Sequence, residues 1–197
     1  MMLQNLNRST WAFDMKSKLP VLGICAAASN VGKTTFITKL IPILAQRGIR
    51  VSVIKHAHHQ FDIDHPGKDS FNIREAGAVQ TLIASGKRWA LMTEMQRTPA
   101  ADGEADLQSL LATLNHDYAD LILVEGFKLA SILKIEIHRP SLGYPLLATQ
   151  DPLIIAIASD APITATTKVL DLNALDTIAN FIQQTLIPNT NHHHDNT

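Results

Sequence analysis

One short run of residues, 27–35, constrains this chain more than any other feature. The run reads Ala-Ala-Ser-Asn-Val-Gly-Lys-Thr-Thr, follows an apolar stretch over 19–25 and opens a segment with helical spacing. A strand, a tight turn and a helix N-terminus in this order form a phosphate-binding loop, because backbone N–H groups and the helix dipole both favour an anion there. The usual G-x-x-x-x-G-K-[ST] pattern has glycine where this chain has Ala27, but the Gly-Lys-Thr-Thr core is intact. The run therefore predicts a nucleotide-phosphate site; the alternative is an ordinary helix start with a lysine in its first turn.

The residues of this run have distinct expected roles. Consecutive N–H groups wrap a β-phosphate. The residues expected to contact the nucleotide are Ser29, Asn30, Val31, Gly32, Lys33, Thr34 and Thr35. Lys33 reaches the β and γ oxygens as a mobile point charge, which also makes it a candidate catalytic residue. The Thr34 hydroxyl is an oxygen ligand of the kind that Mg²⁺ takes.

Composition excludes several function classes. The chain of 197 residues has a net charge of −1 and 5% aromatic residues. It therefore lacks the basic field that holds nucleic acid or an anionic membrane, and it has few rings on which bases stack. No apolar run reaches the roughly 18 residues of a membrane-spanning helix. Cys25 is the only cysteine, so no disulfide forms within the chain and a reducing, cytoplasmic compartment is expected.

The order of the predicted elements indicates an α/β fold. Apolar and β-branched runs predict strands at 19–26, 50–55, 79–84, 88–93, 121–124, 134–138 and 153–158. Helical spacing predicts helices at 34–47, 70–78, 104–114 and 175–186. Because a strand–helix–strand unit with short links is right-handed, the first two strands should be parallel in one sheet. We expect a P-loop NTPase-like, mostly parallel sheet with helices on both faces and a small β-hairpin-type insertion.

We expect one P-loop domain over residues 19–187, which the family resemblance described below makes a GTP-binding domain. Residues 1–18 lack the apolar core of a secretory signal and predict a flexible N-terminal extension. Residues 188–197 contain three consecutive histidines and predict a disordered polar tail. The leucine stripe over 107–114 predicts core packing rather than an interface.

Glu125 is the second most informative residue. It follows a strand without polar residues, 121–124. Ligands gather at the carboxyl ends of strands in open α/β sheets, so an acid there can hold Mg²⁺ directly or through water. Gly126 would let the backbone approach a γ-phosphate. The alternative is a solvated acid at the end of a strand.

The segment after the second strand is rich in histidines and acids. Lys55 and His56 end that strand at the same sheet edge, and His56 and His58 can reach a nucleotide or gate a substrate; surface histidines are the alternative. Residues 62–74 are similar to a switch region, in which Asp64 orients a water or supports the metal. A solvated charged loop is the alternative.

Two further groups of polar residues follow later strands. Asp160 can accept hydrogen bonds from guanine N1–H and N2–H, although the chain has no clear Asn-Lys-x-Asp element. A second set flanks the segment after Glu125 and predicts a solvated basic face, with phosphate or partner binding as the alternative. Its members are Lys128, Lys134, His138 and Arg139.

A set of motifs in a fixed order resembles a known family. Besides the loop, the chain contains Val-Ile-Lys-His-Ala-His-His, Pro-Gly-Lys-Asp-Ser, Arg-Glu-Ala-Gly-Ala, Arg-Trp-Ala-Leu-Met-Thr-Glu, Leu-Ile-Leu-Val-Glu-Gly-Phe-Lys and Ile-Ala-Ser-Asp. Together they resemble the MobB family of molybdopterin-guanine dinucleotide biosynthesis adaptors, over residues 19–186. Members of that family commonly lack the first loop glycine.

The resemblance implies a P-loop protein that binds GTP and Mg²⁺, has weak GTPase activity and forms a homodimer. It implies assistance to the guanylyltransferase MobA, which attaches GMP to molybdopterin, and proteins that load molybdopterin are a further possible partner class. By the same resemblance, residues 30–35 are expected to bind phosphate, and Thr34 and Glu125 to bind the metal. Lys55 and His56 are expected to lie near the nucleotide.

Two other functions remain open from the residues alone. A small-molecule kinase on the same scaffold needs a base, for which His56, Asp64 and Glu125 are candidates. A metallochaperone would use His56, His58, His59 and His65 for a transition metal, although this spacing is a weak metal signature. The family resemblance places the GTP-binding adaptor first.

Overall fold

The computed structural model describes residues 19–57, 61–99 and 105–187. The expected extension at 1–18, the expected tail at 188–197, and His58 and His59 lie outside these ranges. The chain divides into two compact units. The first unit combines the described residues up to His56 with those from Leu107 onward. The second unit consists of the described residues from Ala57 to Asp106.

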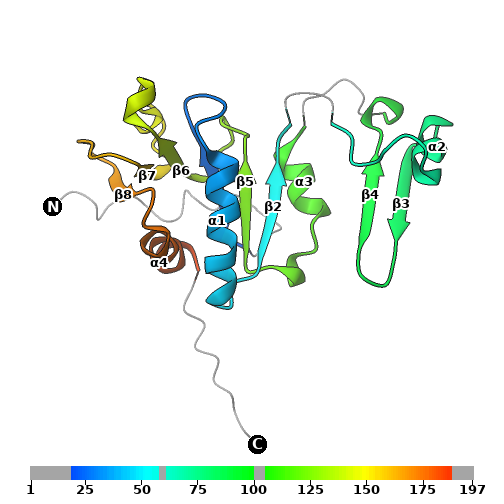
Figure 1. Cartoon of the computed structure of the whole chain (residues 1–197), viewed down its shortest axis with the longest axis horizontal. Coiled ribbons are helices and arrows are strands. Elements are labelled where there is room, and N and C mark those ends of the chain that lie inside the picture. Colours follow the sequence, from blue (N-terminus) through cyan, green and yellow to red (C-terminus); the bar gives the residue numbers. More distant parts are fainter. Residues whose placement is uncertain (1–18, 58–60, 100–104, 188–197) are drawn as a thin grey trace, which may run out of the picture. The chain divides into compact units, whose positions relative to one another are not determined.

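The first unit is built on a six-stranded sheet in the order β2-β5-β1-β6-β7-β8 (Figure 1). Its strands are β1 (Val21–Cys25), β2 (Val51–Lys55), β5 (Leu121–Glu125), β6 (Leu133–His138), β7 (Ile154–Ser159) and β8 (Lys168–Asp171). Every strand pair in this sheet is parallel. β1 and β2 are therefore parallel members of one sheet, as predicted, with β5 between them. All six carboxyl ends lie at one edge, where open α/β sheets bind ligands.

Helices cover both faces of this sheet, which confirms the predicted fold class. α1 (Lys33–Gln46) and α4 (Leu175–Leu186) cover one face, and α3 (Leu107–Thr113) packs against the other. Successive residues of β5 alternate between the two cores, since Leu121 and Leu123 belong to the first and Ile122 and Val124 to the second. The buried leucines of α3, Leu107 and Leu111, lie in the second core, as the stripe predicted.

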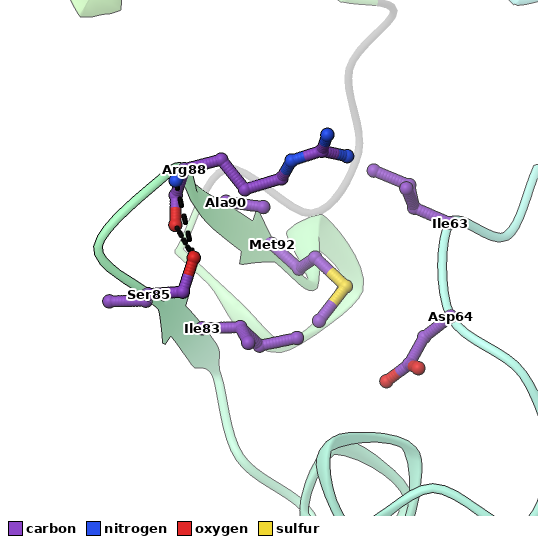
Figure 2. A pocket seen from close by; sticks show the side chains of 8 residues that line it. Ile63, Asp64, Ile83, Ser85, Arg88, Ala90 and Met92 are labelled. Atoms are coloured by element: carbon purple, nitrogen blue, oxygen red, sulfur yellow. Dashed lines mark hydrogen bonds between the residues drawn. The ribbon is translucent and has the colours of Figure 1, made fainter.

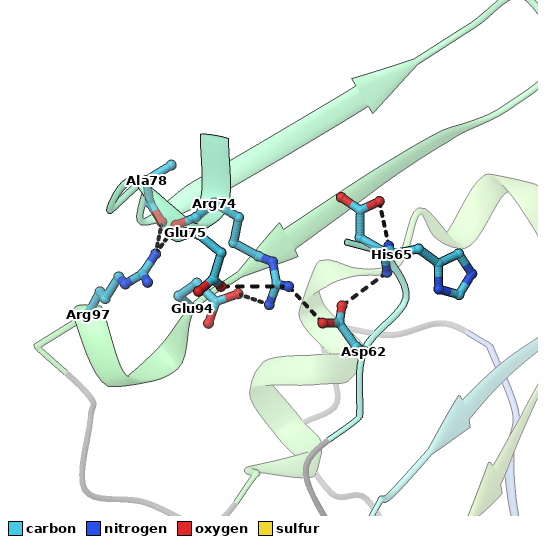
Figure 3. Close-up of polar contacts among 8 residues, drawn as sticks. Asp62, His65, Arg74, Glu75, Ala78, Glu94 and Arg97 are labelled. Carbon is cyan, nitrogen blue, oxygen red and sulfur yellow. Dashed lines mark hydrogen bonds and ion pairs between the residues drawn. The ribbon is translucent and has the colours of Figure 1, made fainter. Parts of the chain in front are cut away.

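The second unit contains the predicted hairpin. β3 (Gln80–Ala84) and β4 (Trp89–Thr93) pair antiparallel, and α2 (Asp69–Glu75) precedes them. The Ser85 hydroxyl closes the turn by accepting from the N–H groups of Lys87 and Arg88, each at 3.2 Å. Arg74 lies between three carboxylates in this unit (Figure 3), with Asp62 at 2.7 Å and Glu94 at 3.4 Å the nearest.

Some elements were not predicted. β8 is a four-residue edge strand with one buried side chain, Leu170, so its pattern is too short to recognise. Single 3₁₀ turns in the described ranges were also missed, namely η2 (Met95–Arg97), η3 (His116–Tyr118), η4 (Pro140–Leu142) and η5 (Leu147–Thr149). The last two lie in the connection from β6 to β7, and backbone N–H groups of η5 donate to Glu136 of β6.

Candidate functional site

The loop between β1 and α1 has the geometry of an anion site. Asn30 and Gly32 have left-handed backbone conformations, with φ of 61° and 110°. Gly32 is the N-cap of α1, and within the described chain no side chain caps this helix start. The first backbone N–H groups of a helix have no intrahelical partner, so those of α1 are available to an anion at the positive end of the helix dipole.

The Lys33 side chain folds back over this loop. Its ammonium donates to the carbonyl oxygen of Ala28 at 3.1 Å. This single bond to a neutral acceptor is weak enough to be exchanged for charge-assisted bonds to phosphate. The ammonium of Lys33, the predicted phosphate-binding lysine, therefore lies against the loop that precedes α1.

Thr34 and Glu125 come together from opposite parts of the sequence. The Thr34 hydroxyl donates to Glu125 Oε1 at 2.8 Å, and the Lys55 ammonium lies 3.8 Å from Glu125 Oε2. Glu125 is only 8% exposed, so the alternative of a solvated strand-end acid is wrong. A hydroxyl and a carboxylate at this distance fit Mg²⁺, which prefers oxygen ligands and commonly takes one or two from protein beside a phosphate.

His56, Gly126 and Phe127 form a tight contact beside Glu125. The backbone N–H of His56 donates to the Glu125 carbonyl at 2.8 Å, and the His56 ring stacks on Phe127 at 4.7 Å between centroids. A Cβ at Gly126 would lie 2.6 Å from the Cβ of His56, and φ of Gly126 is 91°. The structure therefore explains this glycine by the approach of His56, and it also places Phe127 in a rare left-handed conformation, with φ of 45°.

The predicted solvated basic face after Glu125 is wrong for Lys134 and His138. Lys134 is 2% exposed and its ammonium donates to Asp151 at 2.9 Å, while His138 is 7% exposed. Glu136 between them is fully buried and accepts from two backbone N–H groups of η5. The physical reason is that the connection over 140–153 covers this face of β6, which an alternating polar pattern does not reveal.

Arg139 is a site residue that sequence reasoning placed on that solvated face. Its Nε donates to the Val31 carbonyl at 2.9 Å, and its Nη1 donates to the carboxylate of Asp160. The side chain of Asp160, the predicted guanine reader, is 24% exposed and is engaged by this arginine. Arg139 therefore joins the predicted phosphate-binding loop to the end of β7. Its bond to Val31 spans 108 positions of sequence, and no local pattern signals it.

Asp64 lies in the second unit, at a hollow of about 230 Å³ (Figure 2). Its Oδ1 accepts from the N–H of His65 at 3.0 Å, and the hollow is otherwise lined largely by apolar side chains such as Ile63, Ile83 and Met92. Arg74 is paired with Asp62 and Glu94, so its contacts organise the second unit. The Asp64 N–H and the Arg74 guanidinium hold the pKa of Asp62 below its usual value.

The remaining sequence predictions concern metals and membranes. Across the described ranges, no group of three or more histidine, cysteine or acidic side chains is arranged to hold a metal ion. Of the four histidines proposed for a metallochaperone, only His56 and His65 are described. None of the described helices combines the length and the hydropathy needed to cross a bilayer.

The chain is similar to proteins of one family along most of its length. The family model described as "MobB: Molybdopterin guanine dinucleotide synthesis protein B" matches residues 21–160. A "Molybdopterin-guanine dinucleotide biosynthesis adapter protein" from Escherichia coli (strain K12) is 48% identical over 168 residues, covering 85% of this chain and 93% of that protein. One with the same description from Haemophilus influenzae is 41% identical over 172 residues, covering 87% and 92%.

A solved structure supports the same relationship. The crystal structure of molybdopterin-guanine biosynthesis protein B (mobB) matches with a TM-score of 0.64 and 28% identity, over 84% of this chain and 99% of that chain. The family match covers the loop between β1 and α1, Glu125, Arg139 and Asp160. The chain belongs to the MobB family of molybdopterin guanine dinucleotide synthesis proteins.

Proposed function

We propose that this protein is a GTP-binding adapter in the biosynthesis of molybdopterin guanine dinucleotide. The observation that carries the nucleotide part is the hydrogen bond from Thr34 to Glu125 beside an uncapped helix start. The adapter part is supported by relatives whose names state that role and whose length this chain nearly covers. The partner is the guanylyltransferase MobA, which the adapter assists when GMP is joined to molybdopterin.

The loop residues bind the nucleotide in this proposal. Backbone N–H groups of residues 29–35 hold the β-phosphate, and Lys33 exchanges the Ala28 carbonyl for β and γ oxygens. Thr34 and Glu125 hold Mg²⁺, which neutralises phosphate charge when bound. Lys55 and His56 lie at the same sheet edge, with Lys55 close enough to Glu125 to compete with a cation for its charge.

Slow hydrolysis is consistent with the described site. Fast GTPases place an arginine at the transferred phosphoryl group. Here Arg139 is bound to Val31 and Asp160, and Arg74 is bound to carboxylates of the second unit. We propose Lys33 for charge stabilisation at the phosphates, with complex formation as the main output.

A homodimer is part of the proposal. The hairpin of the second unit exposes large apolar side chains, with Leu82 and Trp89 each 62% exposed and Leu91 48% exposed. An apolar surface of this kind commonly marks a protein interface, and a second copy of the chain is the partner that the family resemblance implies. Light scattering of the wild type and of Trp89→Ser with Leu91→Ser should give a dimer and a monomer; equal masses would contradict this assignment.

Calorimetric titration of the full chain with GTP and with ATP tests the nucleotide assignment. With Mg²⁺ present, we expect GTP binding by the wild type, weaker ATP binding, and loss of GTP binding in Lys33→Ala with an unchanged circular dichroism spectrum. Lys39→Ala is the matched control, since this lysine lies further along α1, about 1.7 turns from Lys33. Unchanged GTP affinity in Lys33→Ala would remove the proposed site, and equal affinities for ATP and GTP would remove the guanine preference.

A further inference from the structure

Arg139 is the first residue after β6 and connects three strand ends. Its Nε donates to the carbonyl of Val31 in the loop after β1, at 2.9 Å, and its Nη1 donates to Asp160 after β7. The arginine side chain is 37% exposed and that of Asp160 is 24% exposed, so the pair is partly shielded from water. Shielding strengthens charge-assisted hydrogen bonds relative to pairs on an open surface.

The bond to Val31 has a direct consequence for the next N–H group. The Val31 carbonyl and the Gly32 N–H belong to one peptide unit, and a trans peptide holds these two groups on opposite sides of the C–N bond. An arginine that holds the carbonyl on one side therefore directs the Gly32 N–H to the other. Donation to the carbonyl also polarises the peptide and strengthens its N–H as a donor.

The flexibility of Gly32 is the reason why the orientation of this peptide has to be fixed. Its φ is 110°, and without a Cβ the peptide before it can rotate at little steric cost. A Cβ at this position would lie 3.4 Å from Nη2 of Arg139, so the guanidinium packs against the bare glycine. A flexible peptide in a phosphate-binding loop loses affinity, because ordering it costs conformational entropy on binding.

We propose that Arg139, held in place by Asp160, is a positioning residue that fixes the Val31–Gly32 peptide in its anion-binding orientation. The consequence for affinity rests on the proposed function, since the anion is the phosphate of the nucleotide. Lys33 remains mobile and supplies charge, whereas Arg139 contacts the loop through the Val31 carbonyl and supplies geometry. The Arg139–Asp160 pair thereby connects the nucleotide-binding loop to the end of β7.

Two measurements on the full chain test this role. The first is hydrogen–deuterium exchange of the nucleotide-free protein, followed in peptides that cover residues 28–36. The second is calorimetric affinity for GTP and for inorganic triphosphate, in the presence of Mg²⁺. The variants are Arg139→Ala, Arg139→Lys and, as the control, Arg50→Ala, which removes an arginine–aspartate pair with Asp120 at the opposite edge of the sheet.

We expect faster exchange of the loop peptides in Arg139→Ala, with unchanged exchange in β5, and about tenfold weaker binding of both ligands, the size expected for a lost charge-assisted hydrogen bond. Arg139→Lys should restore part of both effects, because lysine keeps the charge but lacks the planar fork. Arg50→Ala should change neither measurement. A merely structural role for Arg139 would instead raise exchange throughout the first unit.

The possible failures are distinguishable. Unchanged loop exchange in Arg139→Ala would overturn the positioning role whether or not GTP binds. Faster loop exchange with affinities within twofold of the wild type would overturn the link between loop order and binding. If the wild type binds neither ligand, the proposed function and that link both fail, while faster loop exchange in Arg139→Ala would still support control of the peptide orientation.

Discussion

The Thr34 hydroxyl donates to Glu125 Oε1 at 2.8 Å, joining the first turn of α1 to the end of β5 across 91 positions of sequence. The contact exists because β5 is the immediate neighbour of β1 and both strands end at the same edge. Glu125 is buried there, and the Lys55 ammonium lies near its second carboxylate oxygen. In the proposed function, a bound divalent cation would replace both contacts with shorter and stronger ones.

The glycine after this glutamate is a sensitive position. Gly126→Ala places a methyl group 2.6 Å from the Cβ of His56 at a backbone φ of 91°. We expect a loss of about 2–4 kcal/mol in the free energy of unfolding, from left-handed strain together with overpacking. Urea denaturation followed by circular dichroism measures this loss.

Two other glycines allow the effect of backbone strain to be measured separately from the effect of overpacking. Gly48 and Gly143 have φ of 75° and 69°, but a Cβ at either position would meet nothing within 4 Å. Their alanine variants should therefore lose only the strain part, about 1–2 kcal/mol. If Gly126→Ala loses no more free energy of unfolding than these two variants, the close approach of His56 does not constrain position 126.

Cys25 should be chemically inert in the folded protein. Burial raises the pKa of its thiol to about 12, with the nearby Glu136 carboxylate as the next contribution. The thiol is therefore protonated at neutral pH, and the protonated form is a poor nucleophile. We expect no reaction with a thiol reagent such as Ellman's reagent until the protein is unfolded in guanidinium. Stoichiometric reaction within minutes under native conditions would show that the Cys25 thiol at the end of β1 is open to solvent.

Acid should weaken the pair at the amino-terminal edge of the sheet. Arg50 donates to both carboxylate oxygens of Asp120 and lowers the pKa of Asp120. A carboxyl whose folded pKa lies below its unfolded value of about 3.9 stabilises the fold above that value, and this contribution disappears as the pH falls through the folded pKa.

The size of this acid effect is limited by solvent. The side chains are 58% and 35% exposed, so we expect no more than about 1 kcal/mol. The measurement is thermal unfolding between pH 7 and pH 2 for the wild type and Asp120→Asn. The variant should be less stable at pH 7, and the difference should shrink in acid; a constant difference over this range would contradict the ion-pair assignment.

Sequence patterns predicted the parts of this molecule that follow from turn chemistry and from the shared edge of parallel strands. The loop before α1, the hairpin of β3 and β4, and the convergence of Thr34 with Glu125 follow from turn chemistry and from the shared edge of parallel strands. Lys134 and His138 were predicted to lie on a solvated basic face, and their alternation with Ile135 and Ile137 is typical of a half-exposed strand. Their actual cover is an irregular connection, whose path depends on tertiary contacts alone.

The same limit applies to Arg139. Nothing near it in sequence indicates that it reaches Val31, because this contact requires β6 to lie beside β1 and the loop to turn toward it. Sequence reasoning found the groups that would touch phosphate and metal, whose residue types carry a chemical signature. It missed the group that orients them, since an arginine after a strand has many ordinary uses.

The central claim is that a triphosphate and Mg²⁺ are held together by the loop, Thr34 and Glu125. Calorimetric titration with GTP, with and without Mg²⁺, tests it most directly in the wild type, Thr34→Val and Glu125→Gln. Thr38→Val is the control, because the Thr38 hydroxyl donates to the Thr35 carbonyl of the same helix. The account predicts that Mg²⁺ strengthens GTP binding at least about tenfold in the wild type and Thr38→Val, as a coupling of roughly 1.4 kcal/mol requires, and by less than about twofold in the other two variants. A Glu125→Gln protein that keeps the full magnesium effect would contradict it.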